Sequence, residues 1–171
     1  MTSIQDKVTL AIAPTARGFG YVIFENPNLI MDYGVKDVRK NKLRDCLLKA
    51  SVLMHMTNPS VLILEDVHDA SSRRSKRVRV LIEKLAELAQ ERGMTVIRCS
   101  RSAVLKLFAE TNAHSKDEIA AAVAKTIPEL ASRLPPRRRI WESEHYSMGM
   151  FEAAALALTV FHNTRSRKLA A

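Results

Sequence analysis

The sequence lacks several features that would assign it to a class at once. It has two cysteines, Cys46 and Cys99, in apolar segments and without the spacing of a disulfide framework or a metal site. Its five glycines form no Gly-rich phosphate-binding loop, which argues against an ATPase. No apolar stretch reaches the length of a membrane span, and the N-terminus lacks the pattern of a signal peptide. We therefore expect a cytoplasmic protein with buried free thiols and no membrane partner.

Acidic residues are also scarce relative to basic ones. The 27 Lys and Arg residues outnumber the 18 Asp and Glu residues, which gives a formal net charge of +9. Such an excess favours a polyanionic partner, most often nucleic acid, although a merely soluble basic protein is the alternative. A length of 171 residues, 47% of them hydrophobic, suits one domain over 1–171 with a sizeable core. We expect the basic segment 164–171 to be a flexible tail.

Hydrophobic periodicity predicts an α/β protein. Apolar runs bounded by turn residues predict strands at 7–13, 19–25, 29–35, 61–64 and 94–99. Helical spacing and capping residues predict helices at 38–57, 72–92, 101–109, 116–126 and 145–163. This order favours a mixed five-stranded sheet, three antiparallel strands followed by two parallel ones, with helices on both faces.

Four short motifs occur along the predicted strands and helices, and their order in the chain is informative. The first hairpin contains Ile12-Ala13-Pro14, a basic turn at Arg17, and then Gly20-Tyr21. The fourth strand ends in LILED, where the Glu is Glu65, and a later helix begins with Ser115-Lys116. The last helix carries FEAAALAL, in which the acid is Glu152. Over nearly the whole chain this pattern resembles the RuvC-type Holliday-junction resolvases of the ribonuclease H-like superfamily.

The resemblance implies a metal-dependent endonuclease that acts on branched DNA as a homodimer. Glu65 and Glu152 match two of the family's metal-binding and catalytic acids, and Mg²⁺ or Mn²⁺ is the implied cofactor. Ala13 stands where the family has a first-strand Asp, which commonly bridges the two metal ions. Alanine has no oxygen to offer a metal, so cleavage is doubtful. The family often has a further acid or His one turn before the main acid of the last helix, and here that position is near Gly149 or Met148.

Three explanations for Ala13 stay open at this point. The alanine is a deliberate replacement that prevents cleavage, or the natural sequence lacks the acid and binds without cutting. Alternatively, Asp66, Glu144 or Asp32 moves into the vacant position. A regular strand would turn Asp66 to the opposite face from Glu65, and the second strand should separate Asp32 from the first.

Basic side chains cluster at two places that could contact phosphates. The segment 73–79, RRSKRVR, contains Arg73, Arg74, Lys76 and Arg77 in the first turns of the predicted helix 72–92. A loop carries Arg137, Arg138 and Arg139 near Trp141, an aromatic that could stack on an unpaired base. Arg17 and Lys116 could also face a phosphate. A solvated basic face is the alternative for each cluster.

Together these observations predict a RuvC-like protein that binds branched or structured DNA. The alternatives are a non-catalytic nucleic-acid-binding module and an active nuclease with a rearranged carboxylate site. Each depends on one placement, in which Glu65 and Glu152 share a cleft beneath the first hairpin.

Overall fold

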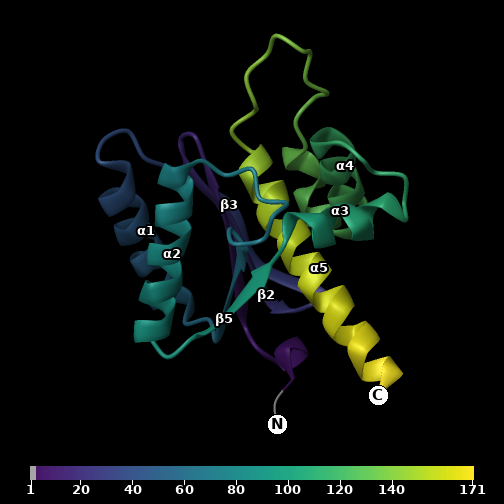
Figure 1. The fold of residues 1–171 in the computed structure, drawn as a ribbon, viewed down its shortest axis with the longest axis horizontal. Helices are drawn as coiled ribbons and strands as arrows, with labels where there is room; N and C mark the ends of the chain where they lie inside the picture. The colour runs from purple at the N-terminus through teal and green to yellow at the C-terminus, as the bar shows by residue number, and fades with distance from the viewer. Residues whose placement is uncertain (1–2) are drawn as a thin grey trace.

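One five-stranded sheet forms the centre of the computed structural model, which describes residues 3–171 (Figure 1). Its strands are β1 (Thr9–Thr15), β2 (Gly18–Asn26), β3 (Leu29–Asp37), β4 (Val61–Glu65) and β5 (Thr95–Cys99). They lie in the order β3-β2-β1-β4-β5. Strands β1, β2 and β3 are antiparallel neighbours, whereas β4 and β5 run parallel to β1. The predicted mixed sheet is confirmed.

Helices cover both faces of this sheet (Figure 1). One core, on the side of α1 (Lys42–Thr57) and α2 (Lys76–Glu91), contains Leu10 and Ile12 of β1. The other core lies under α3 (Arg101–Ala109), α4 (Lys116–Thr126) and α5 (Met148–Ala170), and it contains Ala11 and Ala13. This alternation follows from the two-residue period of a strand. Within residues 3–171, no helix has both the length and the apolar character needed to cross a membrane.

Two glycines set the depth at which α5 lies on the sheet. A Cβ atom at Gly20 in β2 would lie 2.1 Å from the carbonyl carbon of Gly149 in α5. A Cβ atom at Gly149 would lie 2.4 Å from the Thr15 side chain. The first turn of α5 therefore touches the β1–β2 hairpin directly. Alanines at 153, 154, 155 and 157, all buried, let the rest of the helix follow the sheet closely.

Three predicted helices have wrong bounds. The helix expected at 38–57 begins at Lys42, and the other two corrections affect the functional residues. The helix expected at 72–92 begins at Lys76, because Ser75 caps it by accepting a hydrogen bond from the Val78 N–H. Arg73 and Arg74 thus belong to the preceding loop. The helix expected at 145–163 instead runs from Met148 to Ala170, so residues 164–170, expected as a tail, continue the helix.

Candidate carboxylate site and nucleic-acid interface

The carboxyl ends of the parallel strands meet at one edge of the sheet, and α5 begins there. Glu65 is the last residue of β4 and is only 8% exposed. The parallel register pairs Ala11 with Ile63, and its continuation places Ala13 beside Glu65. Glu152 lies in the second turn of α5 and lines the same cavity as Glu65. The structure therefore brings the three positions singled out in the sequence to one corner of the fold.

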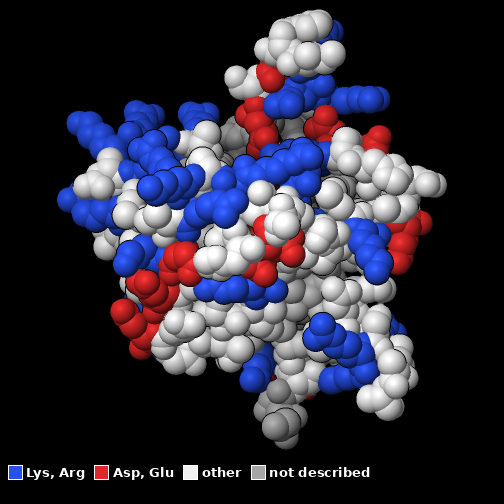
Figure 2. All heavy atoms as spheres, in the orientation of Figure 1, with Lys and Arg blue, Asp and Glu red and all other residues white. Residues whose placement is uncertain are grey.

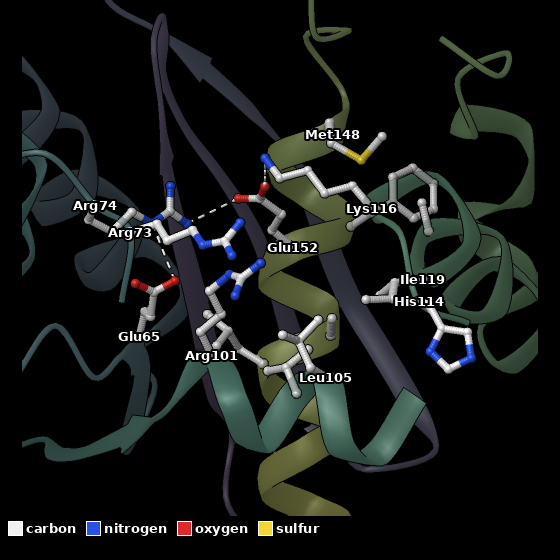
Figure 3. A pocket seen from close by; sticks show the side chains of 15 residues that line it. Glu65, Arg73, Arg74, Arg101, Leu105, His114, Lys116, Ile119, Met148 and Glu152 are labelled. Carbon is white, nitrogen blue, oxygen red and sulfur yellow. Dashed lines mark hydrogen bonds and ion pairs between the residues drawn. The ribbon is translucent and has the colours of Figure 1, made fainter. Parts of the chain in front are cut away.

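A guanidinium group occupies the space between the two carboxylates (Figure 3). Arg74 donates from Nε to Glu65 Oε1 at 3.3 Å and from Nη2 to Glu152 Oε2 at 3.1 Å. Its Nη1 donates to the Pro14 carbonyl oxygen at 3.1 Å, next to Ala13. The Ser72 hydroxyl donates to the second Glu65 oxygen at 3.1 Å. One side chain thus ties β1, β4 and α5 together.

The surroundings keep Arg74 charged. Burial by itself lowers the pKa of Arg74, but attraction to Glu152 and then to Glu65 outweighs it, and hydrogen bonds to both add to the effect. The net result is a raised pKa. The Arg74 side chain is 22% exposed, and those of Glu65 and Glu152 are 10% and 17% exposed. This is a largely buried ion cluster rather than a surface pair.

A second cation contacts Glu152 from α4. Lys116 Nζ lies 2.5 Å from Glu152 Oε1 and 2.8 Å from Glu144 Oε2. Burial lowers the pKa of Lys116, yet attraction to Glu152 and bonds to both glutamates raise it overall. Both Glu152 oxygens are therefore engaged by cations of the protein itself.

The residues present do not fit the divalent metal that the resemblance implies. Ala13 supplies no oxygen, and the facing oxygens of Glu65 and Glu152 accept hydrogen bonds from Arg74. Met148, four residues before Glu152, lines the cavity where a further acid would be needed, while Gly149 is packed against the hairpin. Across residues 3–171, no three or more His, Cys, Asp or Glu side chains gather in an arrangement that could hold a metal ion. Mg²⁺ and Mn²⁺ need several hard oxygen ligands, which this corner lacks.

The three acids considered as substitutes for the missing Asp lie elsewhere or are already engaged. Asp66 accepts a hydrogen bond from the His68 N–H in the turn after β4 and does not line the cavity. Asp32 lies on β3, two strands from β1, and accepts from the Tyr21 hydroxyl at 3.0 Å. Glu144 comes nearest to Glu152, but it does so through the ammonium group of Lys116.

The basic residues divide into internal and exposed groups. Arg74, in the ion cluster, and Arg79, which donates to the carbonyls of Val67 and Arg74, are internal. Lys116 is paired with Glu152, although its side chain is 57% exposed. Among the basic residues singled out in the sequence, seven more are exposed, with one at the β1–β2 turn, three around the start of α2, and three in the loop 134–147: Arg17, Arg73, Lys76, Arg77, Arg137, Arg138 and Arg139. Figure 2 shows blue side chains gathered where α1 and α2 begin and along the projecting loop before α5. In that loop the Arg139 guanidinium lies 5.7 Å from the Trp141 ring centre, and Trp141 is 77% exposed.

Sequence reasoning missed two residues that the structure places in this corner. Ser72 contacts Glu65, and Arg101, at the start of α3, points into the cavity beside Arg73 (Figure 3). Arg101 follows a predicted strand end, so the topology could have placed it at the same sheet edge as Glu65. No sequence pattern distinguishes Arg74, which turns inward, from Arg73, which stays exposed.

Comparisons with known proteins agree with this architecture. No family model and no curated protein sequence matches the chain. Among solved structures, Thermus thermophilus RuvC superposes with a TM-score of 0.63 at 17% identity, covering 94% of this chain and 96% of that one. The same protein in complex with a Holliday junction substrate gives a TM-score of 0.61 at 16% identity, over 94% and 95% of the two chains.

A third structure extends the likeness to eukaryotes. The yeast mitochondrial Holliday junction resolvase Ydc2 superposes with a TM-score of 0.57 at 15% identity, over 94% of this chain and 80% of that one. The matches span nearly the whole sheet and its helices. The chain therefore has the ribonuclease H-like fold in the form found in RuvC-type resolvases, as the order of its motifs predicted.

Proposed function

We propose that this protein binds branched DNA, with the four-way junction as its preferred form, and does not hydrolyse it by metal-dependent chemistry. The observation that carries the proposal is Arg74, whose guanidinium lies between Glu65 and Glu152 beside an alanine at position 13. The fold supports DNA binding, and the composition of the carboxylate corner argues against a metal-dependent cut.

Exposed basic side chains support the DNA-binding half of this proposal. Arg73, Lys76 and Arg77 are exposed at the sheet edge where the carboxylate corner lies, and the loop with Arg137–Arg139 projects from the same end of the molecule. Contacts from such residues to phosphates supply affinity without sequence preference. A solved complex of the structurally similar T. thermophilus RuvC contains a Holliday junction. These points favour a DNA backbone as the polyanion.

Charge supports the non-cleaving half. Two-metal phosphodiester hydrolysis needs carboxylates that hold two divalent ions about 4 Å apart. Here the two remaining carboxylates are neutralised by Arg74 and Lys116, both of which stay protonated at neutral pH. A metal would have to displace a guanidinium that makes three hydrogen bonds. Among the explanations for Ala13, the proposal adopts a natural loss of the acid.

A homodimer completes the proposal, because a four-way junction presents two equivalent halves. Leu43 of α1 is 39% exposed and Val80 of α2 is 42% exposed, and both line a cavity of about 280 Å³ between the two helices. An apolar surface of this kind on α1 and α2 is suited to a two-fold contact. Light scattering should give twice the mass of one chain. In the Val80→Asp variant, the measured mass should fall to that of one chain. A monomer that still binds junctions would remove dimerisation from the proposal.

The central experiment compares a labelled four-way junction with a linear duplex of the same sequences, in EDTA and in 5 mM Mg²⁺ or Mn²⁺. We expect tight junction binding that is equal with and without the metal, at least tenfold weaker duplex binding, and no cleavage products. Divalent-dependent strand cleavage would refute the non-cleaving half. Equal affinity for junction and duplex would refute junction preference.

A further inference from the structure

The cavity beside the two carboxylates has an apolar wall as well as a charged rim. Its volume is about 320 Å³, at the lower end of the range of about 300–1,000 Å³ typical of small-ligand pockets. Helices α3, α4 and α5 supply aliphatic and aromatic lining: Val104, Leu105, Ile119, Phe151 and Leu156. A ligand that fits this cavity must therefore combine an apolar body with a charged group.

The rim indicates the sign of that charge. Four Lys and Arg side chains line the cavity, namely Arg73, Arg74, Arg101 and Lys116, against the carboxylates of Glu65 and Glu152. Arg74 and Lys116 are used in ion pairs with those carboxylates. Within residues 3–171, neither Arg73 nor Arg101 has a carboxylate partner. Figure 3 shows both guanidinium groups directed into the cavity beside the two acids. The uncompensated charge at the rim of the cavity is therefore positive.

We propose that this cavity holds one unpaired nucleotide of a DNA strand, with its base against the apolar wall and its phosphate on Arg73 and Arg101. A nucleotide has the required chemistry, since its base has two apolar faces and its phosphate is an anion that guanidinium groups bind well. The proposal rests on the proposed function and names the part of the junction that enters the site.

Branched DNA supplies such a nucleotide at low cost. Extruding a base from a duplex costs a few kcal/mol in lost stacking and pairing, and the cost is lowest where the base is already unpaired. In the open form of a junction, whose arms are not stacked on one another, nucleotides at the branch point lack one stacking neighbour. A cavity that accepts an extruded base therefore favours a junction over a continuous duplex, at the edge of the sheet where the exposed cations lie.

Base capture can be measured separately from junction binding. A junction with 2-aminopurine next to the branch point becomes brighter when that base leaves the stack. We expect a several-fold rise in fluorescence on binding of the unaltered protein. Arg101→Ala and Leu105→Asp should each remove most of the rise, while weakening junction affinity by no more than about tenfold.

Two variants on α3 serve as matched controls. Lys106→Ala removes a positive charge, and Ser102→Asp adds a negative one, at exposed positions that do not line the cavity. Both should keep the full rise in fluorescence. Free dAMP should bind the unaltered protein far more weakly than the junction does.

Each outcome supports or overturns the assignment. A bound junction with no rise at any position flanking the branch point, or a rise unchanged in Arg101→Ala and Leu105→Asp, overturns base capture and leaves junction binding intact. Binding of dAMP tighter than that of the junction assigns the cavity to a free nucleotide and overturns the DNA-strand assignment. Absence of any junction binding overturns the proposed function, and base capture with it.

Discussion

Restoring the missing acid by Ala13→Asp should not restore a metal site unless Arg74 is also removed. The Arg74 guanidinium donates a charge-assisted hydrogen bond to each carboxylate, at 3.3 and 3.1 Å. Bonds of this type each contribute about 1.5–3 kcal/mol. A divalent ion that displaces both of these hydrogen bonds loses about 3–6 kcal/mol of binding free energy, which weakens its affinity roughly 10²- to 10⁴-fold.

Calorimetric titration with Mn²⁺ tests this difference. The unaltered protein and Ala13→Asp should show no saturable binding up to the millimolar range. The double variant Ala13→Asp/Arg74→Gln should bind at least 100-fold more tightly, and Glu65→Gln in that background should abolish the binding. The matched control, Ala13→Asp/Arg77→Gln, removes a neighbouring exposed cation and should behave like Ala13→Asp alone.

Two results would refute this reasoning. One is Mn²⁺ binding by Ala13→Asp as tight as that of the double variant, which would show that Arg74 moves aside at little cost. The other is binding by the control as tight as by the double variant, which would assign the effect to overall charge. Thermal unfolding of every variant identifies any that fails to fold.

Four further predictions concern the rest of the molecule. We expect the triple replacement of the exposed cations Arg73, Lys76 and Arg77 by Ala to make DNA binding less sensitive to salt. In a filter-binding series, the slope of log K against log salt concentration should decrease in magnitude by about 0.9 for each DNA phosphate that the protein no longer neutralises. An unchanged slope would remove this segment from the interface. Arg74→Ala should lower the free energy of unfolding by about 3–5 kcal/mol in urea titrations, because it leaves two largely buried carboxylates without their cation, and a decrease below about 1 kcal/mol would show that water replaces it. Burial, and then the nearby Glu65 and Asp66, raise the pKa of Cys99 to about 12, and burial also raises the pKa of Cys46. Because the thiolate is the reactive form, neither cysteine should react with a disulfide reagent at pH 8 until the protein unfolds. Fast labelling of the native state would contradict this prediction. Gly20→Ala should lower the free energy of unfolding by about 3 kcal/mol or more, since its Cβ atom would lie 2.1 Å from backbone atoms of α5. The Cβ atom of Gly93→Ala meets no atom within 4 Å, so this variant should lose only about 1 kcal/mol, from the strain of its positive φ.

Much of this corner could be predicted because its geometry follows from topology. A Glu that ends a buried strand parallel to the first strand must lie at the edge where the first hairpin turns. An Ala-rich helix with one acid must turn its small residues to the sheet, and this leaves Glu152 at the rim of the core. Both inferences need only strand order and helix period. The same strand order placed Asp32 too far away to help.

The roles of individual arginines could not be predicted in the same way. Arg73 and Arg74 are adjacent and chemically identical, and only the turn at Asp69–Ser72 decides which side chain points inward. The start of α2 lies four residues later than the apolar periodicity predicts, because Ser75 is the residue that caps it. With Ser75 as the cap, Arg74 would have been expected in the loop that faces Glu65. The length of α5 was missed because its last turns are polar and lack an apolar face.

The carboxylate pair has a structural task that does not depend on metal. Glu152 is the only acid on α5, and it accepts from Arg74 of the loop before α2 and from Lys116 at the start of α4. Glu65 accepts from the same arginine and from Ser72. The two glutamates therefore hold two basic segments against the sheet edge, and loss of either would leave a buried guanidinium short of a partner.

In a metal enzyme the divalent ions would neutralise these acids. Here protein cations do so. Arg73 and Arg101, which have no carboxylate partner within residues 3–171, add positive charge to the cavity in which we propose a phosphate. On this reasoning Ala13 and Arg74 are coupled, because a carboxylate at position 13 would take part in the ion pairs that now hold Arg74 between Glu65 and Glu152.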